Sequence, residues 1–461
     1  MASGTWADLR GGLMSSYSNK DVQRGDASMH HYQWAKTPPM GWNSWDCYGA
    51  SVTEDEVKGN AEYMAKYLKP FGWEYVVVDI QWYEPGANSS IYRPFVPLEM
   101  DEYSRLMPAV NRFPSAKGGK GFKPLADYIH SLGLKFGIHI MRGIPRQAVH
   151  QNTPILGTNV GARDIADTNS ICPWNTDMYG VDHRKEGAQA YYDSLFQLYA
   201  QWGVDFVKVD DIAASKLYGT HTEEIKMIRK AIDRCGRPMV LSLSPGPAPL
   251  DHATLFVENA NMWRMTDDFW DRWELLYDMF ERCYKWCKLV GPGHWPDADM
   301  LPLGNIGIRS VDGGGTDRMT RFTKDEQRTM MTLWIIFRSP LMFGGELRDN
   351  DEWTLSLLTN EEVLHVHQNG YGARQVYREN DHVVWTSQDA EGNQFVAMFN
   401  ISEKRSVVSV SLKDLGCMEP MKARDLWAKE DLGLVKHQLA FELGPHQSIL
   451  VKLSPAVGKG L

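Results

Sequence analysis

Short apolar runs alternate with longer amphipathic segments from about residue 37 to residue 360, and this alternation most constrains the fold. Apolar runs bounded by turn residues are typical of parallel strands that are buried on both faces of a sheet. The segments between them carry apolar residues at helical spacing, which indicates helices packed against that sheet. The clearest strand candidates are EYVVVDI (74–80), LKFGIHI (134–140), DFVKVDDI (205–212) and PMVLSLS (238–244).

Repeated strand–helix units over about 320 residues predict a (β/α)8 barrel with right-handed crossovers. A doubly wound sheet is the alternative, but no glycine-rich phosphate loop follows the first strand. From about residue 370 apolar and polar residues alternate between frequent turns, which predicts an antiparallel β-sandwich. We therefore expect an N-terminal extension or tag at 1–36, the catalytic barrel at 37–365 and the sandwich domain at 366–461.

Charge and hydropathy exclude several classes of partner. The 461 residues include 49 basic and 58 acidic side chains, a net charge of −9, with no dense basic cluster. Neither a nucleic acid nor an anionic membrane surface is therefore an expected partner. No apolar run is long enough to cross a bilayer, and the first residues lack the pattern of a signal peptide. A cytoplasmic location is expected, with a secreted mature form and the oligomeric state left open.

The six cysteines are thinly spread and do not resemble a disulfide framework, which favours a reducing compartment. Cys283 and Cys287 lie four residues apart on an expected helix and therefore share a face. A metal site would need two further ligands at suitable spacing, and the sequence offers none. We expect two small buried residues here, and neither a metal nor a cofactor in the protein.

Polar residues collect where the expected strands end, which is the end of a barrel that carries its chemistry. Asp79 comes directly after VVV, His139 lies in GIHI, and Ser242 and Ser244 lie in LSLS. Lys208 and Asp210 lie toward the end of DFVKVDDI. Because side chains alternate along a strand, Lys208 and Asp210 share a face. A cation beside Asp210 would hold this carboxylate ionised at neutral pH, as the nucleophile of a retaining glycosidase requires.

A retaining glycosidase also needs a second carboxyl group to protonate the leaving group. The strongest candidate stretch is NMWRMTDDFWDRW (261–273), in which Arg264 precedes Asp267, Asp268 and Asp271. The alternative is an N-cap and an acidic first turn of the following helix, which would explain these aspartates without chemistry. The spacing of these aspartates does not decide between a catalytic carboxyl group and an acidic helix start. Asp211 is expected to be a loop or capping carboxylate.

Aromatic residues near the same strand ends favour a sugar site, because rings stack on the apolar faces of sugars. They occur in MGWNSW (40–45), in QWYEPG (81–86) and at Trp263, although a single tryptophan is more often core packing. Residues 144–182 have no clear period and are expected to form a long loop that builds a pocket wall.

Taken in order, these stretches resemble glycoside hydrolase family 27, the α-galactosidase family, from about Thr37 to the C-terminus. The family consists of retaining enzymes with a (β/α)8 barrel and a C-terminal β-sandwich, and the resemblance implies both here. The motifs that carry it are TPPMGWNSW, EYVVVDI, KVD, WRMTDDFWDRW, GPGHWPDADML and LLTNEEVLHVHQNGYG.

The resemblance implies roles for individual residues. Asp210 is the implied nucleophile, and Asp268, four residues after Arg264, is the implied acid/base. No metal or cofactor is implied. The implied substrate contacts are Arg264 for the 2-OH, Lys208 and Asp79 for ring hydroxyls, and Trp45 for the pocket floor.

Three positions depart from the pattern of α-galactosidases. Ile80 stands where a second aspartate normally binds the sugar 6-OH, and losing such a charge-assisted bond costs about 1.5–3 kcal/mol. Ser244 stands where α-galactosidases usually carry a glutamate for the 2-OH, and a serine there resembles α-N-acetylgalactosaminidases, which need room for the acetamide. His139 replaces the usual tyrosine and is expected to hydrogen-bond near the nucleophile. Gln81 and Ile212 occupy the positions that pair with Cys47 and Cys172 in disulfide-bearing relatives, so those bridges are not expected.

Ile80 favours galactose without its C6 group, which is L-arabinopyranose. The resemblance therefore implies a retaining exo-glycosidase that acts on terminal β-L-arabinopyranosides and, more weakly, on α-D-galactosides. The alternatives are an ordinary α-galactosidase or α-N-acetylgalactosaminidase, and, from another class, a non-catalytic carbohydrate-binding protein. The expected partners are small glycosides or the terminal sugars of larger saccharides.

Overall fold

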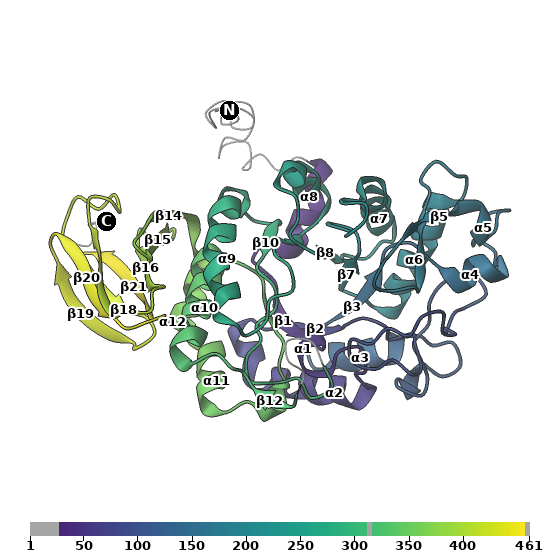
Figure 1. Cartoon of the computed structure of the whole chain (residues 1–461), viewed down its shortest axis with the longest axis horizontal. Coiled ribbons are helices and arrows are strands. Elements are labelled where there is room, and N and C mark those ends of the chain that lie inside the picture. The colour runs from purple at the N-terminus through teal and green to yellow at the C-terminus, as the bar shows by residue number, and fades with distance from the viewer. Residues whose placement is uncertain (1–26, 311–315, 457–461) are drawn as a thin grey trace.

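The computed structural model describes residues 27–310 and 316–456, which form a barrel followed by a β-sandwich (Figure 1). The barrel sheet has eight parallel strands in the order β10-β9-β8-β7-β3-β2-β1-β13. Leu301 joins its two edges, because Leu301 N donates to Met342 O at 2.8 Å and Gly344 N donates to Leu301 O at 2.9 Å. The predicted (β/α)8 barrel is confirmed. Its strands are β1 Met40–Asn43, β2 Tyr75–Val78, β3 Lys135–Met141, β7 Phe206–Asp210, β8 Val240–Leu243, β9 Met262–Arg264, β10 Trp295–Asp297 and β13 Leu341–Phe343.

Helices cover the outside of this sheet, and local sequence signals set where some of them begin. At α10, Thr323 Oγ1 accepts from Glu326 N and Glu326 Oε2 accepts from Thr323 N, which is a capping box. The helices are α1 Trp45–Tyr48, α2 Glu54–Tyr63, α3 Lys123–Ser131, α6 Ala188–Trp202, α7 Thr222–Arg234, α8 Ala253–Asn259, α9 Trp273–Trp286, α10 Lys324–Phe337, α11 Glu352–Leu358 and α12 Glu361–Asn369. Shorter turns of helix are η3 Met64–Leu68, η4 Lys69–Phe71, η5 Pro114–Ala116, η6 Leu250–His252, η7 Cys287–Leu289 and η8 Leu347–Asp349.

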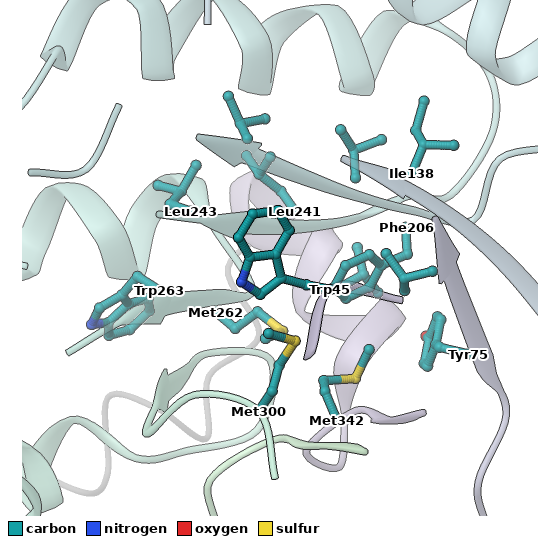
Figure 2. Close-up of a cluster of buried hydrophobic side chains, with 14 of the residues drawn as sticks. Trp45, Tyr75, Ile138, Phe206, Leu241, Leu243, Met262, Trp263, Met300 and Met342 are labelled. Atoms are coloured by element: carbon teal, nitrogen blue, oxygen red, sulfur yellow. The ribbon is translucent and has the colours of Figure 1, made fainter. Parts of the chain in front are cut away.

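Large apolar side chains fill the barrel below the strand ends, and Figure 2 shows Trp45 at the centre of this cluster. The parallel register pairs Phe206 with Gly137 and with Val240. Two residues further on, it pairs Lys208 with His139 and with Ser242. Paired residues of neighbouring strands point to the same face, so apolar packing around Phe206 supports a polar layer around Lys208.

The segment 144–182, expected as a long loop without a clear period, contains a small antiparallel sheet of order β4-β6-β5. Figure 1 shows it at the end of the molecule opposite the sandwich. Strands this short leave no periodic signal in a sequence, which is why the pattern did not predict them. Its elements are β4 Ile144–Pro145, α4 Arg146–Gln151, α5 Ala162–Ile165, β5 Ala166–Ile171 and β6 Met178–Val181; a separate pair is β11 Asn305–Ile306 and β12 Arg318–Met319.

The C-terminal part is an antiparallel β-sandwich, as predicted. A six-stranded sheet of order β14-β15-β16-β21-β18-β19 lies between the barrel helices and the pair β17-β20. Because both of its faces are covered, β16 is buried almost without interruption instead of alternating. Trp385 is fully buried in this sheet. The strands are β14 Tyr371–Glu379, β15 His382–Gln388, β16 Gln394–Asn400, β17 Ser406–Ser411, β18 Met421–Asp425, β19 Glu430–Val435, β20 Gln438–Leu443 and β21 Ser448–Pro455.

The expected extension at 1–36 lies mostly outside the described residues. Its described part forms η2 Ala27–Ala35, where Tyr32 Oη donates to Val257 O at 2.9 Å and Ala35 O accepts from Trp295 Nε1 at 2.8 Å. The domain boundaries at 36/37 and 365/366 stay predictions. Within the described ranges, no helix combines the length and the apolar character needed to span a membrane.

Candidate active site

A chain of polar contacts joins the ends of three adjacent strands, β2, β3 and β7. Lys208 Nζ donates to Asp79 Oδ2 at 3.0 Å, and Asn43 Nδ2 donates to the same oxygen at 2.8 Å. His139 Nε2 lies 2.9 Å from Asp210 Oδ2, and Asp211 N donates to Asp210 Oδ1 at 2.7 Å. The structure therefore brings together four of the predicted site residues, and Asn43 joins them from the end of β1.

This arrangement holds both carboxylates in the ionised form. Burial alone would raise the pKa of Asp210, but the hydrogen bond and charge of His139, the charge of Lys208 and the amide of Asp211 outweigh burial and lower it. The pKa of Asp79 is also lowered, because Lys208, His139 and two hydrogen bonds outweigh burial. The same two carboxylates raise the pKa of Lys208 against the effect of burial. The result is an ionised, partly buried Asp210 at a barrel strand end, which is the state that a nucleophile requires.

Arg264, the last residue of β9, connects a second set of carboxylates. Its Nη2 donates to Asp268 Oδ1 at 2.8 Å, and its Nη1 lies 3.2 Å from Asp299 Oδ1. The Arg264 side chain is 4% exposed, whereas that of Asp268 is 62% exposed. Asp268 therefore combines access from solvent with one buried cation that orients it.

The two other aspartates of this segment differ in burial. Asp271 accepts from both terminal nitrogens of Arg318, and Asp267 is exposed. α9 begins only at Trp273, with Arg272 as its N-cap, so these aspartates precede the helix and none of them caps it. Asp211, expected as a structural carboxylate, forms a buried ion pair with Arg142 at 3.1 Å. Burial raises the pKa of Asp211 to about 6, with Arg142 opposing this rise.

The remaining predicted site residues line the same strand ends. Ile80 is 2% exposed, and its backbone N donates to Asp79 Oδ1 at 2.9 Å. Ser244 N donates to Val209 O at 2.9 Å, which fixes Ser244 beside the end of β7. Trp45 N donates to Asn43 Oδ1 at 2.9 Å, which ties this ring to the residue that contacts Asp79.

Sequence reasoning missed three buried carboxyl groups in this region, Asp46, Asp297 and Asp299. Burial raises the pKa of Asp46, with Asp299, Asp268 and Asp79 adding to this rise and Lys208 opposing it. Asp46 Oδ2 has no hydrogen-bond partner within the described part of the chain. The short motifs MGWNSWD and PDADM contain these aspartates, but neither motif signals that they meet other charged residues.

A separate cavity of about 650 Å³ lies beside the β4-β6-β5 sheet. Arg146 lies between the rings of Phe95 and Tyr179 there, 5.0 Å and 4.2 Å from their centres, and Asp177 also lines the cavity. Asp177 Oδ2 accepts from Gln81 Nε2 at 2.9 Å. Neither Asp210 nor Asp268 lines this cavity, so it is distinct from the strand-end site.

The cysteines are free, which agrees with the absence of bridges expected for Cys47 and Cys172. Cys283 is fully buried and Cys287 partly buried on α9. Within 27–310 and 316–456, no group of three or more His, Cys, Asp or Glu side chains has the arrangement of a metal site.

The barrel, the sandwich and the carboxylates at the strand ends are those of a class of protein, the glycoside hydrolases built on a barrel and a C-terminal β-sandwich. The sequence matches a family model described as Alpha galactosidase A over residues 37–185 and 183–369. It also matches a model described as Alpha galactosidase C-terminal beta sandwich domain over residues 379–453. The chain belongs to this melibiase family, glycoside hydrolase family 27.

Three relatives, one of them also as a variant, illustrate the range of this family. A GH27 β-L-arabinopyranosidase from Geobacillus stearothermophilus is 99% identical, covering 94% of this chain and 100% of its own, with a TM-score of 0.93. An aspartate-to-alanine variant of it, in complex with arabinose, is 98% identical, covering 93% and 100%, with a TM-score of 0.93. A putative α-N-acetylgalactosaminidase from Bacillus halodurans is 65% identical, covering 91% and 97%, with a TM-score of 0.84. An α-galactosidase from Cyamopsis tetragonoloba is 28% identical over 426 residues, 91% of this chain and 87% of its own.

Proposed function

We propose that the protein hydrolyses terminal β-L-arabinopyranosides and, more weakly, α-D-galactosides, with retention of configuration. The observation that carries the sugar preference is Ile80, a buried apolar residue directly after Asp79. β-L-arabinopyranose has the ring geometry of α-D-galactose but lacks the C6 group. It therefore has no 6-OH that would need a hydrogen-bond partner at the position of Ile80. The similarity to a β-L-arabinopyranosidase, and the arabinose bound to a variant of that enzyme, support the same sugar.

In the first half of the reaction, an oxygen of Asp210 attacks C1 of the sugar while the glycosidic C1–O bond breaks. Asp268 transfers its proton to the departing oxygen, and the sugar stays bound to Asp210 as a covalent ester. The lowered pKa of Asp210 supports its role as nucleophile, because only the ionised carboxylate attacks.

In the second half, Asp268 acts as a base and takes a proton from water. The water oxygen forms a bond to C1 as the C1–Oδ bond to Asp210 breaks, which releases the sugar with its original configuration. The high exposure of the Asp268 side chain supports this role, because both the water and the leaving group must reach it.

The remaining residues would hold the sugar in place. Lys208 and Asp79 form a buried ion pair whose spare donors and acceptors suit neighbouring ring hydroxyls. Arg264 is assigned to the 2-OH and Trp45 to the pocket floor, with His139 orienting the nucleophile. The proposed reaction uses no cofactor. The proposed partners of the protein are small glycosides or the terminal sugars of larger saccharides.

A second candidate function is that of an α-N-acetylgalactosaminidase, and Ser244 is the observation that favours it. A serine leaves room for an acetamide where α-galactosidases usually carry a glutamate, and one relative is named as a putative enzyme of this type. Those enzymes keep the 6-OH aspartate, so Ile80 favours the arabinoside instead.

A cytoplasmic location stays a prediction, supported by the free cysteines.

The test is a side-by-side assay on the nitrophenyl glycosides of β-L-arabinopyranose, α-D-galactose and α-N-acetylgalactosamine. We expect the highest kcat/KM for the arabinoside, with the galactoside about 10- to 100-fold lower, because the 6-OH lacks a charge-assisted bond. A higher kcat/KM for either of the other substrates would overturn the sugar assignment. Binding of arabinose without turnover of any substrate would instead favour a non-catalytic carbohydrate-binding protein.

A further inference from the structure

Asp299 contacts the acid/base segment at two points. Its Oδ1 lies 3.2 Å from Arg264 Nη1, the guanidinium that orients Asp268. Its Oδ2 accepts from Phe269 N at 2.8 Å, the amide of the residue after Asp268. One buried carboxyl group therefore holds both the side-chain partner of Asp268 and the backbone next to it.

The position of Asp299 is itself held from several sides. Its φ is +80°, in the left-handed region that a residue with a side chain rarely adopts. Asp297 Oδ1 accepts from Asp299 N at 2.8 Å, and Trp334 Nε1 donates to Asp299 O at 3.0 Å. A backbone conformation of this kind persists only where the surrounding structure imposes it, and such residues concentrate at active sites.

Asp268 depends on this support more than its neighbours do. Its side chain is mostly exposed, and Arg264 is the one ion-pair partner that the described residues provide for it. A general acid must carry a proton in the first step, whereas an adjacent guanidinium favours the ionised form. Asp299 holds Nη1 of the same guanidinium, which leaves Nη2 for Asp268. Burial raises the pKa of Asp299 and the charge of Arg264 opposes this rise, so the two groups interact electrostatically as well as by contact.

We propose that Asp299 is a positioning residue for the acid/base, which fixes Arg264 and the Phe269 amide so that Asp268 faces the glycosidic oxygen with its proton. The inference rests on the proposed role of Asp268. Asp46, Asp297 and Lys208 also act on this cluster, since each contributes to the charge around Arg264 or Asp299. The contribution of Asp299 is therefore measured by comparing kcat/KM of an Asp299 variant with kcat/KM of a control variant.

The test variant is Asp299→Asn, which keeps the shape and removes the charge. We expect kcat/KM to fall about 10- to 100-fold for an arabinoside with a poor leaving group, a part of the usual contribution of general acid catalysis. With an activated leaving group such as dinitrophenolate, which departs without protonation, we expect less than a threefold change.

The matched control is Asp271→Asn, which removes a buried carboxylate from the loop that carries Asp268. Asp271 accepts from Arg318 and from the Arg321 amide instead of from Arg264. This control variant should change kcat/KM by a similar factor for all substrates. If Asp299→Asn behaves like this control, Asp299 is merely structural and the inference is wrong. If Asp299→Asn does not fold, Asp299→Ser is measured in the same way, because its smaller side chain also lacks the charge.

Asp268→Ala, measured alongside, separates this inference from the proposed function. It should slow substrates with poor leaving groups far more than activated ones. If Asp268→Ala lacks this dependence, the acid/base assignment fails and the inference about Asp299 fails with it. If Asp268→Ala has the dependence and Asp299→Asn does not, only the inference about Asp299 fails.

Discussion

His139 Nε2 lies 2.9 Å from Asp210 Oδ2, across the adjacent strands β3 and β7. The side chain of His139 is 1% exposed, and its Nδ1 has no partner among residues 27–310 and 316–456. The ring therefore has one polar contact, and that contact is with the proposed nucleophile. This contact is one of the causes that lower the pKa of Asp210 against the effect of burial.

The first prediction concerns His139→Phe, which removes that contact. The pKa of Asp210 should rise, so activity should be lost at a higher pH on the acidic side of the profile. A charge-assisted hydrogen bond of about 1.5–3 kcal/mol corresponds to about 1–2 pKa units. The measurement is the acidic limb of kcat/KM against pH, which should shift upward by that amount.

His130→Phe is the matched control, because His130 contacts Asp205 in the same way just before the start of β7. It should leave the acidic limb of the profile unchanged. An unchanged limb in His139→Phe would mean that His139 does not act on the nucleophile.

The second prediction is that Asp210→Ala lowers kcat by about 10⁴-fold or more, as the loss of a nucleophile does. Mass spectrometry after incubation with a slow fluorinated glycoside should find the covalent sugar on the native protein and not on this variant. Asp211→Asn changes the neighbouring carboxyl group, which is paired with Arg142, and should retain turnover. Full activity of Asp210→Ala would exclude the proposed mechanism.

The third prediction is that Ile80→Asp raises the ratio of kcat/KM for the α-galactoside over the arabinoside. A carboxylate at this position can accept from the 6-OH, which is worth about 10- to 100-fold. Ile80→Val, which stays apolar, should leave the ratio unchanged. Equal ratios in both variants would mean that the 6-OH is recognised by another residue.

The fourth prediction concerns the contact between the sandwich and the barrel. His446, between β20 and β21, stacks on Trp273 with ring centres 3.5 Å apart, and its Nδ1 lies 2.8 Å from Glu326 Oε1. His446→Ala should lower the free energy of unfolding by about 1–2 kcal/mol, because a stacked ring and a partly buried hydrogen bond to Glu326 are lost.

Thermal unfolding measures this effect, with His437→Ala on an exposed turn of the same domain as control. If the two variants have the same unfolding temperature, the stacked pair contributes nothing to stability. A selective loss of activity in His446→Ala would show that the sandwich also supports the loop before α9.

Much of the fold could be predicted from local pattern. Apolar runs such as Tyr75–Val78 are buried on both faces, so the sequence signals them without knowledge of their neighbours. The period of two along Phe206–Asp210 placed Lys208 and Asp210 on one face, and the structure agrees. The short strands of 144–182 escaped prediction because two to six residues do not establish a period.

The sequence by itself determined the order of strands and helices, the class of fold and the carboxylates at the strand ends, because these depend on residues close together in the chain. Only the tertiary structure decided which charges meet. Asp299 reaches Arg264 and Phe269 because β9 and β10 pair side by side, with Arg264 opposite Asp297. Contacts of this kind depend on how a closed barrel aligns distant segments, and no local periodicity encodes that alignment.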